Sequence, residues 1–144
     1  MRRVSLVVIA VAALLLIGVV WVYAVFHGVF DPGTFVVEQA RWASDTQVAI
    51  VARRFDHQAL SGDEYFVVVA SHASSPADLK RAYYHDDIVF QAASDCLNVR
   101  WQNARELIVS CTDRSITAGE IEVERDSVRD IRVSYEDIPR MLKK

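Results

Sequence analysis

The chain begins with a run of apolar residues that has no polar face. Residues Val4 to Phe26 include no charged side chain. A helix over this run, rising about 1.5 Å per residue, would be roughly 34 Å long and could cross a hydrocarbon core of about 30 Å. Arg2 and Arg3 precede the run, and the next Lys or Arg in the sequence is Arg41. Because basic residues stay on the cytoplasmic side, the pattern predicts a single-pass membrane span with residues 1–3 in the cytoplasm.

A cleaved signal peptide is the main alternative for this run. Signal peptides carry a shorter apolar region of about 7–15 residues, followed by small residues at the cleavage site. The only passable cleavage site here is Val22-Tyr23-Ala24, which has a bulky central residue. Trp21 and Tyr23 suit the lipid headgroup region. The pattern therefore favours an uncleaved anchor over residues 4–26, followed by a linker over residues 27–33.

The segments after the linker have the residue types and spacing of β-strands. Strand-forming residues gather in eight segments that are separated by polar turn residues. These segments are Phe35–Trp42, Val48–Phe55, Tyr65–Ala70, Ile88–Ala92, Leu97–Gln102, Glu106–Thr112, Ile121–Arg125 and Ile131–Tyr135. We expect hairpins between the first two segments, the fifth and sixth, and the last two. Tyr65–Ala70 is almost entirely apolar, which predicts a strand that is buried on both faces.

One helix is predicted within this region. Ser75 is suited to be its N-cap, with Pro76 at the first helical position and Asp78 in place of the usual Glu or Gln of a capping box. The helix should cover Pro76–Tyr84. We expect it to close one end of the β core, and a recognition surface is the alternative.

Composition supports a single folded domain outside the membrane. From Asp31 onward, the sixteen basic residues less Arg2 and Arg3 leave fourteen, against nineteen acidic residues, which gives a net charge of −5. No basic stripe occurs, so we expect no nucleic-acid partner. The predicted fold class is mainly β: one N-terminal transmembrane helix, then a small antiparallel β-rich domain, a sandwich or a twisted sheet, over residues 34–138. One short capping helix and a C-terminal tail over residues 139–144 complete it.

The location of the domain and the register of its strands make opposite predictions for the two cysteines. An exported domain favours a disulfide between Cys96 and Cys111. If Trp101 opposes Leu107, however, Leu97 opposes Cys111 on one apolar face, and the side chain of Cys96 points to the other face. The hydrophobic register therefore favours two free thiols, although a β-bulge could allow the disulfide.

Few residues carry candidate chemistry. Asp56-His57 and His85-Asp86-Asp87 could supply metal ligands or a base with its orienting carboxylate, and His72 follows an apolar strand. No zinc motif, nucleophile elbow or glycine-rich phosphate loop occurs. We therefore assign no catalytic, cofactor-binding or metal-binding residue and expect no cofactor.

Three segments carry a resemblance to a known group of proteins. They are VVEQARWASDTQVAIVARR, DCLNVRWQNARELIVSC and DSVRDIRVSYED. The chain resembles small, N-terminally membrane-anchored bacterial exported proteins of unknown function, in which Ser-Pro-Asp-Gly stands where this chain has Ala43-Ser44-Asp45-Thr46. The resemblance implies a bacterial envelope domain and carries over no catalytic residue.

The leading hypothesis is therefore a membrane-anchored extracytoplasmic domain that binds or scaffolds a protein partner without catalysis, with an immunity or inhibitor protein as one form. We expect two partners: the lipid bilayer through Val4–Phe26, and a protein at the outer, membrane-facing surface. Localisation would be the bacterial cell membrane. The alternative is a membrane-anchored envelope enzyme that uses the Asp56-His57 and His85-Asp87 loops.

Overall fold

The computed structural model describes residues 12–23, 33–55, 62–112 and 115–140. The chain divides into two units, residues 1–32 and residues 33–144. In the first unit, residues 12–23 are helical, and their large apolar side chains are exposed. Among the described residues, no helix has both the length and the apolar character needed to cross a membrane. The span expected over Val4–Phe26 extends beyond the described residues and stays a prediction.

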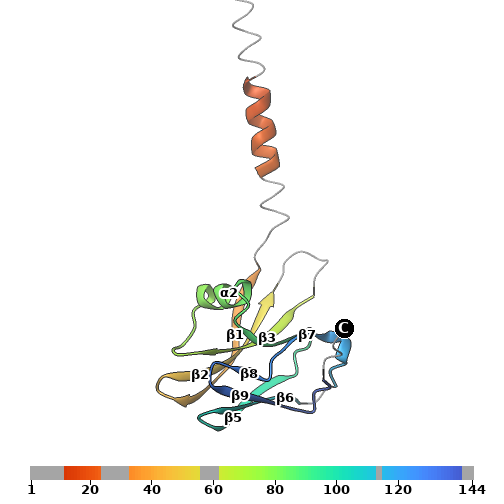
Figure 1. The fold of residues 1–144 in the computed structure, drawn as a ribbon. Helices are drawn as coiled ribbons and strands as arrows, with labels where there is room; N and C mark the ends of the chain where they lie inside the picture. Colours follow the sequence, from red (N-terminus) through yellow and green to blue (C-terminus); the bar gives the residue numbers. More distant parts are fainter. Residues whose placement is uncertain (1–11, 24–32, 56–61, 113–114, 141–144) are drawn as a thin grey trace, which may run out of the picture. The chain divides into compact units, whose positions relative to one another are not determined.

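The described residues of the second unit form two β-sheets (Figure 1). The larger has five strands in the order β1 (Thr34–Ser44), β2 (Gln47–Phe55), β3 (Glu64–Ala70), β4 (Ile88–Ala92) and β7 (Ile121–Glu124). The smaller has four strands in the order β5 (Leu97–Asn103), β6 (Glu106–Cys111), β9 (Ile131–Glu136) and β8 (Ser127–Val128). The predicted mainly β class is confirmed, as are the hairpins β1–β2 and β5–β6.

The five-stranded sheet is covered on both of its faces. On one face, Ala49, Val51 and Val67 share a core with Leu97, Val99, Leu107 and Val109 of the smaller sheet. On the other face, Ile50, Phe66 and Val68 share a second core with Leu79. The interior of β3 alternates between these two cores, so Phe66, Val67 and Val68 are all buried. The predicted burial of this strand on both faces is confirmed, and it follows from a three-layer arrangement.

The third layer is helix α2 (Pro76–Tyr84), whose predicted bounds are confirmed. Ser75 caps it: the Ser75 hydroxyl oxygen accepts a hydrogen bond from the Asp78 N–H, and the Asp78 carboxylate accepts one from the Ser75 N–H. Leu79 is completely buried and packs with Phe35 and Phe66, which project from one face of the large sheet. The helix therefore covers a face of the sheet, and the expectation that it closes one end of the core was wrong.

The expected final hairpin is also wrong. β7 pairs with β4 in the large sheet, and β9 pairs in parallel with β6 in the small sheet. The chain makes its tight turn later, where Val128 opposes Ile131 between β8 and β9. Because β5 pairs with only one edge of β6, β9 can pair with the other edge and place Val133 next to Leu107. Among the strands that the structure describes, β6 and β9 form one parallel pair, and the other pairs are antiparallel.

The two cysteines form a disulfide, which corrects the expectation of free thiols. The sulfur atoms are bonded, and the Cα atoms of Cys96 and Cys111 lie 4.8 Å apart. The predicted register is nevertheless right, since Leu97 opposes Cys111 and Trp101 opposes Leu107. Cys96 lies in the turn that precedes β5, outside the paired strand, so the alternation of strand side chains does not set its direction. The N–H of Thr112 still donates to the Cys96 carbonyl, at 3.1 Å, and holds the two ends together.

Candidate functional site

The His85-Asp86-Asp87 segment forms the end of α2. The His85 N–H donates to the Arg81 carbonyl at 3.0 Å, and the Asp87 N–H donates to the Ala82 carbonyl at 3.0 Å. Asp86 adopts a left-handed backbone conformation, and Arg125 pairs with its carboxylate at 2.8 Å. These contacts give the segment a structural role. Asp56-His57 lies outside the described residues, so the alternative of an enzyme that uses both loops stays untested.

The described residues do not assemble a metal site. Within residues 12–23, 33–55, 62–112 and 115–140, no three His, Cys, Asp or Glu side chains gather closely enough to hold a metal ion. The sulfur atoms of Cys96 and Cys111 are bonded to each other. Neither is therefore a thiolate ligand or nucleophile while the bridge is intact.

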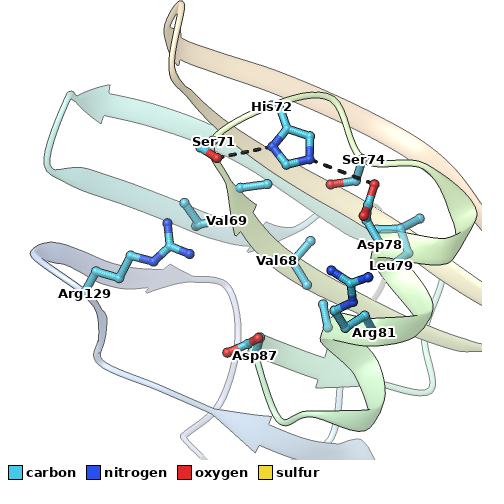
Figure 2. A pocket seen from close by; sticks show the side chains of 12 residues that line it. Val68, Val69, Ser71, His72, Ser74, Asp78, Leu79, Arg81, Asp87 and Arg129 are labelled. Atoms are coloured by element: carbon cyan, nitrogen blue, oxygen red, sulfur yellow. Dashed lines mark hydrogen bonds and ion pairs between the residues drawn. The ribbon is translucent and has the colours of Figure 1, made fainter.

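A cavity of about 220 Å³ lies beside α2 (Figure 2). Three parts of the chain bound it: the end of β3 with the segment that follows, α2 with the residues after it, and the turn between β8 and β9. The polar residues of its wall are Ser71, His72, Ser74, Asp78, Arg81, Asp87 and Arg129. Val68 and Leu79 contribute apolar surface. Charged groups from elements distant in the sequence thus meet around a partly apolar hollow.

Ser71, His72 and Asp78 have the residue types of a catalytic triad but not its geometry. The Ser71 hydroxyl lies 3.2 Å from His72 Nδ1, whereas His72 Nε2 lies 3.9 Å from Asp78 Oδ2, beyond hydrogen-bond distance. The same Asp78 oxygen accepts hydrogen bonds from the Ser75 hydroxyl at 2.7 Å and the Ser75 N–H at 3.0 Å. These bonds lower the pKa of Asp78. Asp78 therefore caps the helix, and the cavity is better suited to holding a ligand than to transferring a proton.

The two arginines of the cavity were not predicted from the sequence. Among the described residues, the side chains of Arg81 and Arg129 form no hydrogen bond or ion pair. Figure 2 shows the two guanidinium groups on different sides of the hollow. Arg129 and Asp130 lie between two strands, as expected for turn residues, but nothing local to them indicates which helix the turn approaches.

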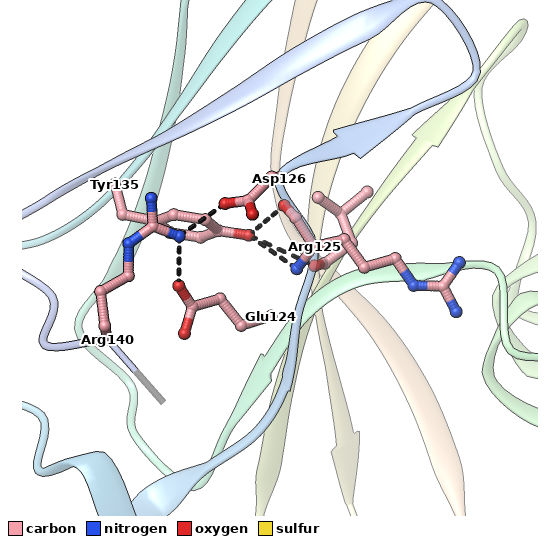
Figure 3. A network of polar contacts seen from close by, with 6 residues as sticks. Glu124, Arg125, Asp126, Tyr135 and Arg140 are labelled. Atoms are coloured by element: carbon pink, nitrogen blue, oxygen red, sulfur yellow. Dashed lines mark hydrogen bonds and ion pairs between the residues drawn. The ribbon is translucent and has the colours of Figure 1, made fainter. Parts of the chain in front are cut away.

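A second polar network surrounds Tyr135 (Figure 3). Its hydroxyl donates to the Arg125 carbonyl at 2.6 Å and accepts from the Arg125 N–H at 3.1 Å. Burial raises the pKa of Tyr135. Arg140 donates to Glu124 and to Asp126, both at 2.6 Å, and its guanidinium lies 5.4 Å from the centroid of the Tyr135 ring. These contacts hold Arg140 against the end of β7 and give the network a structural role.

An aromatic cluster lies where α2 meets the first three strands. Phe35, Phe66 and Tyr83 pack edge to face, with ring centroids 5.4–6.1 Å apart. The Tyr83 hydroxyl donates to Glu64, which also pairs with Arg54 at 3.3 Å. Burial and the neighbouring Glu64 carboxylate raise the pKa of Tyr83 to about 12. Tyr83 therefore remains a neutral hydrogen-bond donor at physiological pH, and the cluster has a structural role.

Strand β1 carries an exposed apolar strip. Val37, Ala40 and Trp42 oppose Ala52, Ile50 and Val48 of β2, so they lie on the face of the sheet that α2 covers elsewhere. Their β2 partners are buried, whereas Val37 is 41 % exposed and Trp42 is 49 % exposed. Val37, Ala40 and Trp42 therefore form an exposed apolar strip on the edge strand β1, and α2 does not cover this part of the strand.

Comparison of the chain with known protein families, with characterised proteins and with solved structures finds no significant match. The resemblance to small anchored exported proteins stays a prediction. The geometry of the described residues is therefore the basis for assigning a function.

Proposed function

We propose that this chain is a single-pass membrane-anchored protein whose β-rich domain lies outside the cytoplasm and binds a protein partner without catalysing a reaction. The observation that carries the binding role is the apolar strip of Val37, Ala40 and Trp42 on β1. Exposed aromatic and aliphatic side chains on an edge strand are typical of protein-binding surfaces, in which tryptophan is enriched. A partner that covered the strip would remove this apolar area from water. An immunity or inhibitor protein is one form of such a partner-binding domain.

The disulfide supports the extracytoplasmic location. Disulfides persist in oxidising compartments and are rare in the cytosol, where thiols are kept reduced. Cys96 and Cys111 are both buried, so the bridge is shielded from solvent reductants. A bond placed inside the core in this way is suited to a permanent structural role.

The apolar helix supports the membrane anchor. Within residues 12–23, the large side chains from Leu14 to Tyr23 are all at least 56 % exposed, and they have no polar face. Such a surface is stable in lipid and unfavourable in water. Together with the uncharged run from Val4 to Phe26, and with Arg2 and Arg3 before it, this supports an anchor whose N-terminus is cytoplasmic.

In-cell photo-crosslinking tests the binding role. A photoreactive amino acid in place of Trp42 in the full-length chain should give a discrete crosslinked product in intact cells. The matched control carries the same amino acid in place of Gln102, which is exposed on β5 of the other sheet. A product at position 42 and none at position 102 is the expected result. Equal labelling at both positions, or none at position 42, would contradict the assignment of the strip.

A further inference from the structure

We propose that the cavity beside α2 is a binding site for a carboxylate, held between Arg81 and Arg129. The carboxylate could belong to a small free acid or to an acidic side chain of a protein partner. Only in the second case does the inference rest on the function proposed above. The volume of about 220 Å³ is below the range of about 300–1,000 Å³ typical of drug-sized ligands. A single functional group with a short stem fits that space.

The two guanidinium groups of the cavity wall can bind an anion. Arg81 and Arg129 have no ion-pair partner among the described residues, and the imidazole ring of His72 lies on another side of the hollow. A guanidinium presents forked N–H donors that match the two oxygens of a carboxylate. Val68 and Leu79 form part of the wall, which excludes water from that side and strengthens an ion pair.

Arg129 stands at a turn position whose backbone conformation an arginine rarely adopts. Arg129 has a φ of 55°, in the left-handed region that glycine, asparagine and aspartate adopt most readily. A two-residue turn joins β8 and β9 there, with Val128 opposite Ile131. Non-glycine residues at such angles are enriched at ligand sites. In Figure 2 the turn carries the Arg129 guanidinium to the edge of the cavity.

Two acidic side chains of the cavity narrow the choice of anion. The charge of Asp78 is partly compensated by its hydrogen bonds from Ser75, whereas Asp87 lies exposed at the same cavity. The attraction by Arg81 and Arg129 and the repulsion by these two carboxylates would both double for a phosphate dianion. The cost of taking an anion out of water rises with the square of its charge, so the dianion loses more than a carboxylate monoanion does. The cavity therefore fits a carboxylate better than a phosphate.

The test follows the arginine side-chain N–H signals of the isotope-labelled full-length chain in lipid nanodiscs by NMR. The probes are sodium acetate for a free acid, N-acetylglutamate α-amide for an acidic side chain, and inorganic phosphate for comparison. We expect saturable shifts of the Arg81 and Arg129 signals with at least one carboxylate probe, and affinity at least tenfold weaker for phosphate. The carboxylate probe with the higher affinity identifies the source.

Two variants separate binding from folding. Arg129→Asn suits the left-handed turn position, so it should keep or raise the melting temperature while weakening carboxylate binding at least tenfold. Lys80→Gln removes one positive charge from the same helix at a residue outside the cavity wall, and it should bind as the wild type does. The inference is overturned if neither carboxylate shifts the two signals, if phosphate binds more tightly, or if Arg129→Asn binds as the wild type does. None of these results depends on crosslinking at Trp42, so the two proposals can fail separately.

Discussion

Removal of the disulfide should destabilise the β-rich domain by an amount that the structure allows us to estimate. The bridge joins Cys96 and Cys111, which are 15 residues apart in the sequence. In the chain-entropy description, closing a loop of this length stabilises the folded state by about 3 kcal/mol. A change of 1 kcal/mol shifts the melting temperature of a domain of this size by roughly 4–8 °C, so the double variant Cys96→Ala/Cys111→Ala should melt roughly 12–24 °C lower.

Thermal unfolding of the purified full-length chain, followed by near-ultraviolet circular dichroism, measures this shift. A reductant should lower the melting temperature of the wild type toward that of the double variant and leave the double variant unchanged. Free-thiol counting on unfolded protein prepared without reductant should find no thiol in the wild type. An unchanged melting temperature in the double variant, or two free thiols in the wild type, would refute the reasoning.

Four further predictions concern the helix and the buried tyrosines, each measured by chemical denaturation. Leu79→Ala leaves a cavity at a fully buried position and should lower the free energy of unfolding by about 2–5 kcal/mol. Lys80→Ala should change it by less than about 0.5 kcal/mol, and equal effects of the two substitutions would contradict the packing of α2 on the sheet. Ser75→Ala removes the N-cap and should cost about 1 kcal/mol. Tyr135→Phe removes the hydroxyl that donates to the Arg125 carbonyl, whereas the Arg125 N–H keeps the Val89 carbonyl at 3.1 Å, and the variant should lose about 1–3 kcal/mol of stability. An unchanged stability would contradict a structural role for this network. The pKa of Tyr83 is raised from 10.0 to about 12, so the stability that its protonated hydroxyl contributes is complete below pH 10 and is lost as the pH rises to 12. The stability of Tyr83→Phe should lack this pH dependence. A tyrosinate absorbance titration measures the pKa directly.

Local patterns in the sequence predicted the elements well. Ser75 and Pro76 locate the start of α2, because capping and proline geometry act within a few residues of the helix end. The apolar run of β3 predicts its two-sided burial, because a strand between two cores has no polar face. The pairing of β5 with β6 follows from a short hairpin in which one register alone aligns the apolar residues.

Contacts between residues far apart in the sequence could not be predicted in the same way. Alternating residues in β7 and β9 indicate one buried face each, yet that pattern is equally compatible with pairing to each other or to β4 and β6. Cys96 was misplaced because the rule of alternation applies only inside a strand, and the residue lies one position before β5. Arg81 and Arg129 meet at the cavity only through packing of the helix against distant strands. The candidate site therefore depends on tertiary contacts that carry no local signal.

The most direct test of the central claim, that an anchored domain lies outside the cytoplasm, is labelling by a membrane-impermeant amine reagent. The lysines of the chain are Lys80, Lys143 and Lys144, and all three follow the predicted span. Spheroplasts that produce the full-length chain are labelled intact, and their membranes are then washed at alkaline pH. Our account predicts a labelled chain that stays in the membrane pellet. A chain that is labelled only after lysis would contradict the account.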